Sequence, residues 1–220
     1  MESFTKKELN KVIRGPKRAT YDQEQIYQIL DEHMICHVAY VHEGTPITIP
    51  TGYGRVNDTL YLHGAMKNRM LLGIAELDKA SVTVTHLDGL VLARSVFHHS
   101  VNYRSAVIFG KPRIVTERNE KMMALKVITE NFIPGRWSEA RLPNEKEFNA
   151  TLVIAIPIED ASAKIRAEGV NDEKADLELD VWAGVVPINM VKGEAIPEPD
   201  LKDHITVPQS VGQFWSDRQS

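Results

Sequence analysis

The sequence predicts a mainly β protein in which a Greek-key-like antiparallel barrel is flanked by helices. Three observations lead to this class. Short β-rich runs follow one another from residue 35 onward, turn-forming pairs separate several of them, and no long series of alternating strands and helices occurs. Consecutive short strands joined by turns pair antiparallel, and closing such a sheet removes its exposed edges. A doubly wound parallel sheet is therefore not expected.

The predicted elements can be justified in order along the chain. A helix is expected at 23–33, because Ile26, Ile29 and Leu30 recur at helical spacing after the start signal Thr20-Tyr-Asp. Apolar residues at i, i+3 and i+4 predict two further helices, at 68–77 and 117–131. The expected strands are 35–42, 45–51, 54–63, 80–87, 90–97, 103–115, 152–158 and 181–188, with turns at 43–44, 56–58 and 88–89.

We expect one domain spanning residues 1–220, with a core of about 14–190. A chain of 220 residues can bury about 70% of its unfolded surface, so it needs no disulfide or metal to fold. The single cysteine, Cys36, cannot close a bridge within the chain and is expected in the core. Residues 166–179 are charged and indicate a loop. The Pro-rich tail at 193–220 is expected either to be disordered or to lie along a partner subunit.

Charge and hydropathy exclude several classes of function. With 26 Lys and Arg against 30 Asp and Glu, the net charge is −4, which gives no field that attracts nucleic acid. The basic cluster at 11–18 is short enough to be a solvated arm. No apolar stretch approaches the ~20 residues of a membrane span, and the N-terminus lacks the apolar region of a signal peptide. We therefore expect a cytoplasmic protein without nucleic-acid or membrane partners.

The segment Tyr61-Leu-His-Gly-Ala-Met-Lys-Asn-Arg-Met70 is the first candidate site. A strand ends at His63, glycine lets a ligand approach the backbone, and Asn68 and Arg69 stand where a helix begins. Backbone N–H groups with an arginine can hold a phosphate group, although no Rossmann or P-loop glycine pattern is present. The alternative interpretation is an ordinary strand-to-helix turn with surface charges.

A second candidate site is the segment 97–111, where Asn102, Arg104 and Ser105 border an apolar strand. Polar side chains at the mouth of a buried strand are costly unless they meet a ligand or one another. A zinc site from His63, His98 and His99 is a further alternative. Because His98 and His99 point to opposite faces of an extended strand, we favour hydrogen-bonded structural roles and expect no metal site.

These segments resemble the pyridoxamine 5'-phosphate oxidase-related flavin-binding family, and within it the branch of nitroimidazole-resistance proteins. The resemblance is carried by residues 46–51, by 54–65 together with Asn68-Arg69, and by 102–110. Residues 18–22 and 181–187 also resemble that branch, so the likeness extends over about 14–188. No single motif is specific, but their order and spacing together are.

The resemblance implies a split β-barrel that dimerises and binds FMN in two clefts at the dimer interface. Asn68 and Arg69 would hold the phosphate, residues 48–51 would pass beneath the flavin ring, and residues 102–105 would complete the rim from across the interface. The implied cofactor-binding residues are Thr48, Ile49, Pro50, Thr51, Leu62, His63, Gly64, Ala65, Asn68, Arg69, Asn102, Tyr103, Arg104, Ser105 and Trp182.

Two departures from the family pattern bear on function. Met70 stands where pyridoxamine phosphate oxidases tend to have a lysine, which weakens the case for phosphate binding. The chain after Val186 also lacks the C-terminal arginine and histidine motif that grips the substrate phosphate in those enzymes. We therefore do not expect vitamin B6 oxidation.

The resulting hypothesis is an FMN-dependent oxidoreductase that passes electrons from a reduced nicotinamide nucleotide, NAD(P)H, to a small electron-poor molecule. A flavin supplies the redox chemistry itself, which agrees with the lack of a catalytic triad or carboxylate pair. No catalytic residue is assigned, and a proton donor near the flavin would be His63 or His98. The alternatives are a flavin-binding sensor without turnover and a haem-binding relative, for which His98-His99 is the candidate patch.

Overall fold

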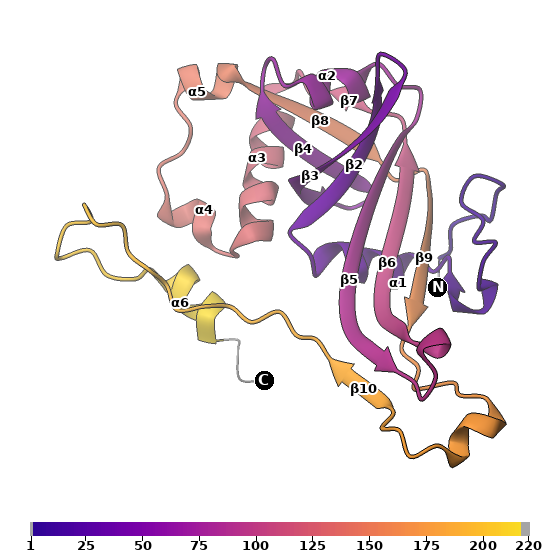
Figure 1. The fold of residues 1–220 in the computed structure, drawn as a ribbon. Helices are drawn as coiled ribbons and strands as arrows, with labels where there is room; N and C mark the ends of the chain where they lie inside the picture. Colours follow the sequence, from indigo (N-terminus) through magenta and orange to yellow (C-terminus); the bar gives the residue numbers. More distant parts are fainter. Residues whose placement is uncertain (1, 217–220) are drawn as a thin grey trace.

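The computed structural model describes residues 2–216, whose strands form one largely antiparallel sheet with helices around it (Figure 1). The strands are β1 (Ala19–Thr20), β2 (Ile35–His42), β3 (Thr45–Val56), β4 (Thr59–Ala65), β5 (Ala80–Leu92), β6 (Ser100–Gly110), β7 (Arg113–Ile114), β8 (Thr151–Pro157), β9 (Asp160–Arg166) and β10 (Gly184–Pro187). The α-helices are α1 (Gln23–Asp31), α2 (Arg69–Ala75), α3 (Arg118–Phe132), α4 (Arg136–Glu139), α5 (Glu145–Ala150) and α6 (Gln209–Ser216). The 3₁₀ turns are Pro16–Arg18, Val96–His98 and Lys174–Glu178.

The strand order is β1-β9-β6-β5-β2-β3-β4-β8-β7, and β10 pairs with β5. The predicted class, mainly antiparallel β with flanking helices, is confirmed. The sheet does not close on itself, however, because β1 and β7 stand at its two ends. Each of these edge strands has only two residues, and short edges limit edge-to-edge aggregation as closure would.

The sheet is split into two halves that share β3 and the β8–β9 junction. Residues 45–52 of β3 pair with β2, whereas Tyr53–Val56 pair with β4. At the other crossing, β8 pairs with β4 and β9 pairs with β6, only two residues further along the chain. At Gly110 a Cβ atom would lie 1.7 Å from the carbonyl oxygen of Pro157, so the backbones touch there.

The helices α1 and α2 bury the apolar face that their spacing indicated, whereas α3 buries Ala124 and Ile128 and leaves Leu125 half-buried. Ile26, Ile29 and Leu30 of α1 are buried in the main core, and the side chain of Asp22 caps the start of that helix. The helices predicted at 68–77 and 117–131 are confirmed as α2 and α3, within two residues at each end. A smaller core lies between α3 and the strands β4 and β8.

Two predicted strand boundaries were wrong. The run expected at 54–63 does not start a new strand: β3 continues from Thr45 to Val56, and the turn expected at 56–58, with Asn57 at a positive φ of 49°, leads into β4. The turn expected at 88–89 is instead a bulge between Leu87 and Gly89, so one strand, β5, runs through both predicted runs. Bulges and turns favour the same residue types, because both need unusual backbone angles.

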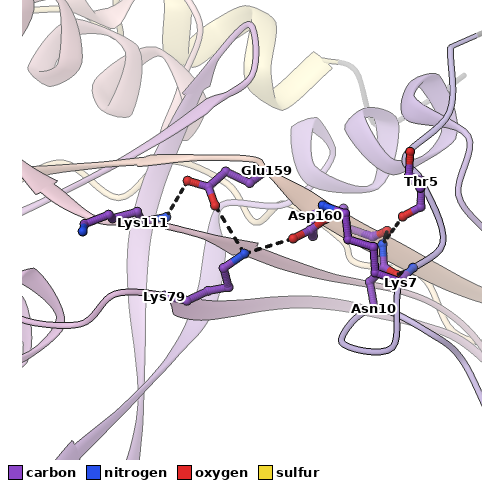
Figure 2. A network of polar contacts seen from close by, with 8 residues as sticks. Thr5, Lys7, Asn10, Lys79, Lys111, Glu159 and Asp160 are labelled. Carbon is purple, nitrogen blue, oxygen red and sulfur yellow. Dashed lines mark hydrogen bonds and ion pairs between the residues drawn. The ribbon is translucent and has the colours of Figure 1, made fainter.

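Residues 5–10, which precede the basic cluster, are anchored at the β8–β9 junction (Figure 2). The Asp160 carboxylate is buried, with 4% of its side chain exposed, and forms ion pairs with Lys7 and, at 3.0 Å, with Lys79. The buried Asn10 amide donates to the carbonyl oxygens of Thr5 and Ala161, each at 3.0 Å. These bonds fix the start of the chain across the place where the sheet splits.

Within residues 2–216, no helix is both long and apolar enough to cross a membrane.

Candidate functional site

The first group of predicted site residues lies where β3 and β4 separate. Their pairing ends at Tyr53 and Leu62. Beyond that point residues 48–51 pair with β2, whereas residues 63–65 pair with β8. No strand among the described residues pairs with the other edge of residues 63–65. Backbone N–H and C=O groups along that edge are therefore available to a ligand.

The corner after β4 is shaped by close contacts with the start of α2. A Cβ atom on Gly64 would lie 2.9 Å from the Asn68 side-chain nitrogen and 3.0 Å from the Leu71 side chain. The Asn68 side-chain oxygen accepts a hydrogen bond of 3.1 Å from the Leu71 backbone N–H, which caps the helix. Its amide N–H groups remain able to donate, because capping uses only the oxygen.

Arg69 follows as the first residue of α2, and its guanidinium is exposed. Within residues 2–216, only Arg14 and Arg69 among the arginines have no acidic or amide partner. The paired arginines are Arg18, Arg55, Arg94, Arg104, Arg113, Arg118, Arg136, Arg141 and Arg166. The nearby Lys67 is likewise exposed, with no acidic partner in the described chain. A planar guanidinium without a carboxylate partner is well suited to bind an anion through two parallel hydrogen bonds.

His63 projects from β4 beside this corner. Partial burial lowers the pKa of its imidazole below the ordinary value, so the ring is neutral at pH 7. No hydrogen-bond partner for it is found within the described residues. A neutral imidazole of this kind can donate or accept a hydrogen bond, or bind a metal. Leu62, in contrast, is fully buried in the core, so only its backbone could contact a ligand.

The second group, Asn102–Ser105 and Trp182, lies elsewhere in the chain. Asn102–Ser105 are on β6, which is separated from β3 by β5 and β2. Trp182 precedes β10, which pairs with the last residues of β5. The Trp182 side chain is exposed and lies over Gly184, where a Cβ atom would be 2.9 Å from the ring. One protomer therefore does not bring the two groups together.

The polar side chains of the second group already have partners. The Asn102 side-chain oxygen accepts hydrogen bonds from Arg166 and, at 3.2 Å, from the Glu168 backbone N–H. The Ser105 and Thr85 hydroxyls lie 3.1 Å apart. The sequence left two possibilities for the polar side chains of this segment: they bind a ligand, or they bond to other groups of the chain. Asn102 and Ser105 bond to other groups of the chain.

Arg104 is bound in the same way. It donates to the two carboxylate oxygens of Asp88 at 3.1 and 3.0 Å, and it also pairs with Glu32. The hydrogen bond to Asp88, and to a smaller extent the one to Glu32, raises the pKa of Arg104. Its positive charge is therefore paired with these two carboxylates. The sequence analysis missed Asp88 and Glu32 as partners of Arg104. No local pattern connects these positions.

A cavity of about 680 Å³ beside Arg104 contains two histidines that the sequence analysis did not select. The rings of His33 and His86 meet edge to face with centroids 4.8 Å apart. His86 Nε2 bonds to the Ile29 carbonyl oxygen at 2.8 Å, and His33 Nδ1 accepts from the Ile35 N–H at 3.1 Å. Burial and the neighbouring His86 lower the His33 pKa, so His33 is neutral and structural.

His63, His98 and His99 are not brought together. His98 and His99 lie at the far end of the β5–β6 hairpin, where His98 Nε2 is 3.8 Å from Glu173 and His99 Nδ1 is 3.1 Å from the Ser95 carbonyl oxygen. Over residues 2–216, no three His, Cys, Asp or Glu side chains lie together as metal ligands.

The outer face of the sheet lies between the two groups and is open. Small or flat side chains cover its centre, where His37 is paired with Pro50 and Ala39 with Thr48. All four residues are exposed. A face of small side chains can approach a flat partner closely, whether a ring system or another sheet.

The fold and these motifs define the chain as a member of the pyridoxamine 5'-phosphate oxidase family, whose family model matches residues 22–165. The predicted family resemblance is thus confirmed. No curated protein matches the chain.

The solved structures that are similar to it include the following three. The flavocytochrome Anf3 from Azotobacter vinelandii is 31% identical, with a TM-score of 0.89 over 94% of this chain and 96% of that one. A FAD and haem binding protein from Mycobacterium smegmatis is 36% identical, with a TM-score of 0.85 over 89% of this chain and 96% of that one. A candidate 5-nitroimidazole antibiotic resistance protein from Bacteroides thetaiotaomicron is 22% identical, with a TM-score of 0.56 over 67% of this chain and 86% of that one, which shows the fold alone.

Proposed function

We propose that this protein binds a flavin nucleotide at the corner between β4 and α2, and that this nucleotide is FMN. The observation that carries the proposal is the exposed, unpaired guanidinium of Arg69 beside the free edge of residues 63–65. Arg69, Lys67 and the Asn68 amide N–H groups would hold the phosphate. The free strand edge would bond to the polar rim of the ring system.

The residues present fit such a group in charge. The corner carries two cations without acidic partners in the described chain, which suits the dianionic phosphate of FMN. Residues 48–51 lie on β3 just beyond the point where β3 and β4 stop pairing, and Thr48 and Pro50 are exposed on the sheet face. FAD contains the same ring and first phosphate, and FAD is named for the similar protein from Mycobacterium smegmatis. Both flavins therefore belong in the test.

We propose that the working form is a homodimer. In one protomer three strands, β5, β2 and β3, separate the group on β6 from β4 and its corner with α2. A second copy packed on the open sheet face would bring Tyr103 and Trp182 of that copy toward the first copy's corner. It would also exclude water from a ring bound in the seam between the two.

The activity that we propose is electron transfer from a reduced nicotinamide nucleotide to a small electron-poor molecule. A bound flavin supplies that redox chemistry, and the chain's own residues bind it, orient it and shield it. The neutral His63 imidazole lies beside the corner and is the group available to hold a proton near the ring. No residue is assigned as catalytic.

Haem binding is the second candidate function. Two of the similar solved structures, at 31% and 36% identity, are described as a flavocytochrome and as a haem-binding protein. Histidine is a common axial ligand of haem iron. His33, His86 and His99 have ring nitrogens engaged in hydrogen bonds, whereas His37, His42, His63 and His204 have no such partner within residues 2–216. Of these four, His63 is the one on β4 at the corner proposed for the flavin. His63 is therefore the ligand that we propose for this function, in place of the His98-His99 patch.

Reconstitution tests these proposals. Chain supplied with FMN or FAD and freed of excess should retain visible flavin absorption with quenched fluorescence, and failure with both flavins would refute the flavin proposal. Anaerobic stopped-flow mixing with NADH or NADPH then separates an enzyme from a sensor, because only an oxidoreductase bleaches the bound flavin within turnover times. Haem titration should give a Soret band that His63→Ala weakens and His98→Ala leaves unchanged.

A further inference from the structure

The chain ends in an extended arm, residues 188–216, that leaves the body after β10 (Figure 1). At its start, the Ile188 N–H donates to the Asp88 carbonyl oxygen at 3.1 Å. At its end, α6 is fixed by Ser210, whose N–H and hydroxyl both bond to the Glu139 carboxylate. Between these points the arm's backbone hydrogen bonds are local, from Leu201 to Glu198 and from Ile205 to Lys202. The arm is thus held at both ends and extended between them.

The middle of the arm is rich in exposed aliphatic side chains. Met190 is 74% exposed, Val191 is 75% exposed and Ile196 is 93% exposed. Ile196, Leu201, Ile205 and Val207 line a cavity of about 810 Å³ formed where the arm loops back toward α6, and Arg136 and Glu139 of α4 line its polar side. Contiguous exposed apolar surface of this kind marks a contact site.

An exposed apolar turn lies on the opposite side of the molecule. Val96 and Phe97, in the 3₁₀ turn beyond the ends of β5 and β6, are each 86% exposed. Figure 1 places this turn far from the loop of the arm, so the turn of a chain cannot fill the cavity of its own arm. Because the turn and the cavity lie apart on one molecule, a contact between them requires a second copy.

We propose that a second copy of this chain inserts its Val96–Phe97 turn into the cavity of the arm, and that the two copies do so reciprocally. The arm contains 29 described residues, comparable to the roughly 20–30 residues per side of a standard interface. The similarity to the solved flavocytochrome covers 94% of this chain and so extends into the arm. The contact between turn and arm would form part of the interface of the dimer proposed above, and this inference rests on that proposal.

Engineered disulfides test the contact directly. Cys36 is the only cysteine and is fully buried, so thiols introduced at the surface have no competitor. A chain carrying both Phe97→Cys and Ile205→Cys should form covalent dimers on mild oxidation, whereas each single variant should not. Covalent dimers in a single variant, or none in the double variant, would overturn the contact.

Dimer dissociation provides the second test. In sedimentation equilibrium, Ile196→Asp should raise the dissociation constant at least tenfold, whereas Ile13→Asp, at a site 76% exposed outside the arm, should leave it unchanged. A dimer that tolerates Ile196→Asp overturns the arm contact and leaves flavin binding standing. A wild-type monomer at all concentrations, or a monomer that carries a small apolar ligand in native mass spectrometry, overturns both the contact and the dimer.

Discussion

Replacing Arg69 with alanine is the sharpest single perturbation of the proposed site. Because the Arg69 guanidinium is exposed and has no acidic partner in the described chain, removing it leaves no buried carboxylate without its counter-charge. We therefore expect the free energy of unfolding to change by less than about 0.5 kcal/mol. A hydrogen bond to a charged group contributes roughly 1.5–3 kcal/mol. Since Arg69 is exposed and Lys67 remains beside it, the lower value applies, and FMN should bind about tenfold more weakly.

Fluorescence titration of the variant with FMN and with riboflavin measures this effect. Riboflavin lacks the phosphate, so Arg69→Ala should weaken FMN binding and leave riboflavin binding unchanged. Arg14→Ala removes the other unpaired arginine of the described chain, whose neighbour Gly15 lies beside Lys164 of β9 rather than at α2, and should affect neither ligand. Equal FMN affinities for wild type and Arg69→Ala, or an equal loss for FMN and riboflavin, would refute the assignment of Arg69 to the phosphate.

Two further predictions concern the split in the sheet. Gly110→Ala would place a Cβ atom 1.7 Å from the Pro157 carbonyl oxygen, so it should destabilise the fold by about 1–3 kcal/mol or more in thermal unfolding; Gly193→Ala, whose Cβ meets nothing within 4 Å, should be nearly neutral. Burial opposes ionisation of Asp160, but its lysine partners outweigh burial and lower its pKa. The stability that the carboxylate contributes is therefore present above the unfolded value of about 3.9 and is lost as the pH falls through the lower folded value. Asp160→Asn should destabilise the protein in urea at pH 7, with a difference from wild type that shrinks below about pH 4; a constant difference would contradict the ion pairs.

Much of the fold was predictable because its signals are local. The helices α1, α2 and α3 each repeat apolar residues at helical spacing, and that spacing alone located them. The strand β9 was missed, because its interior alanines and its buried Asp160 and Arg166 give no alternating apolar pattern. These charged residues are tolerated in the interior only because partners from distant segments satisfy them.

The candidate site shows the same limit. The corner at residues 63–69 was found because its strand end, glycine and helix cap are neighbours in sequence. Arg104 resembled a free ligand-binding residue, yet it is held by Asp88 and by the more distant Glu32. Asn102 is likewise held by Arg166 from another strand. Whether a polar side chain is free depends on such tertiary partners, and spacing does not encode them.

The central claim is that two copies of this chain hold flavin at the corner beside Arg69. Sedimentation of the flavin-loaded protein, followed at the visible absorption of the flavin, tests it most directly. We expect the flavin to sediment with a species of twice 24.8 kDa, at one flavin per chain. Flavin that sediments alone, or with a species of 24.8 kDa, would contradict it.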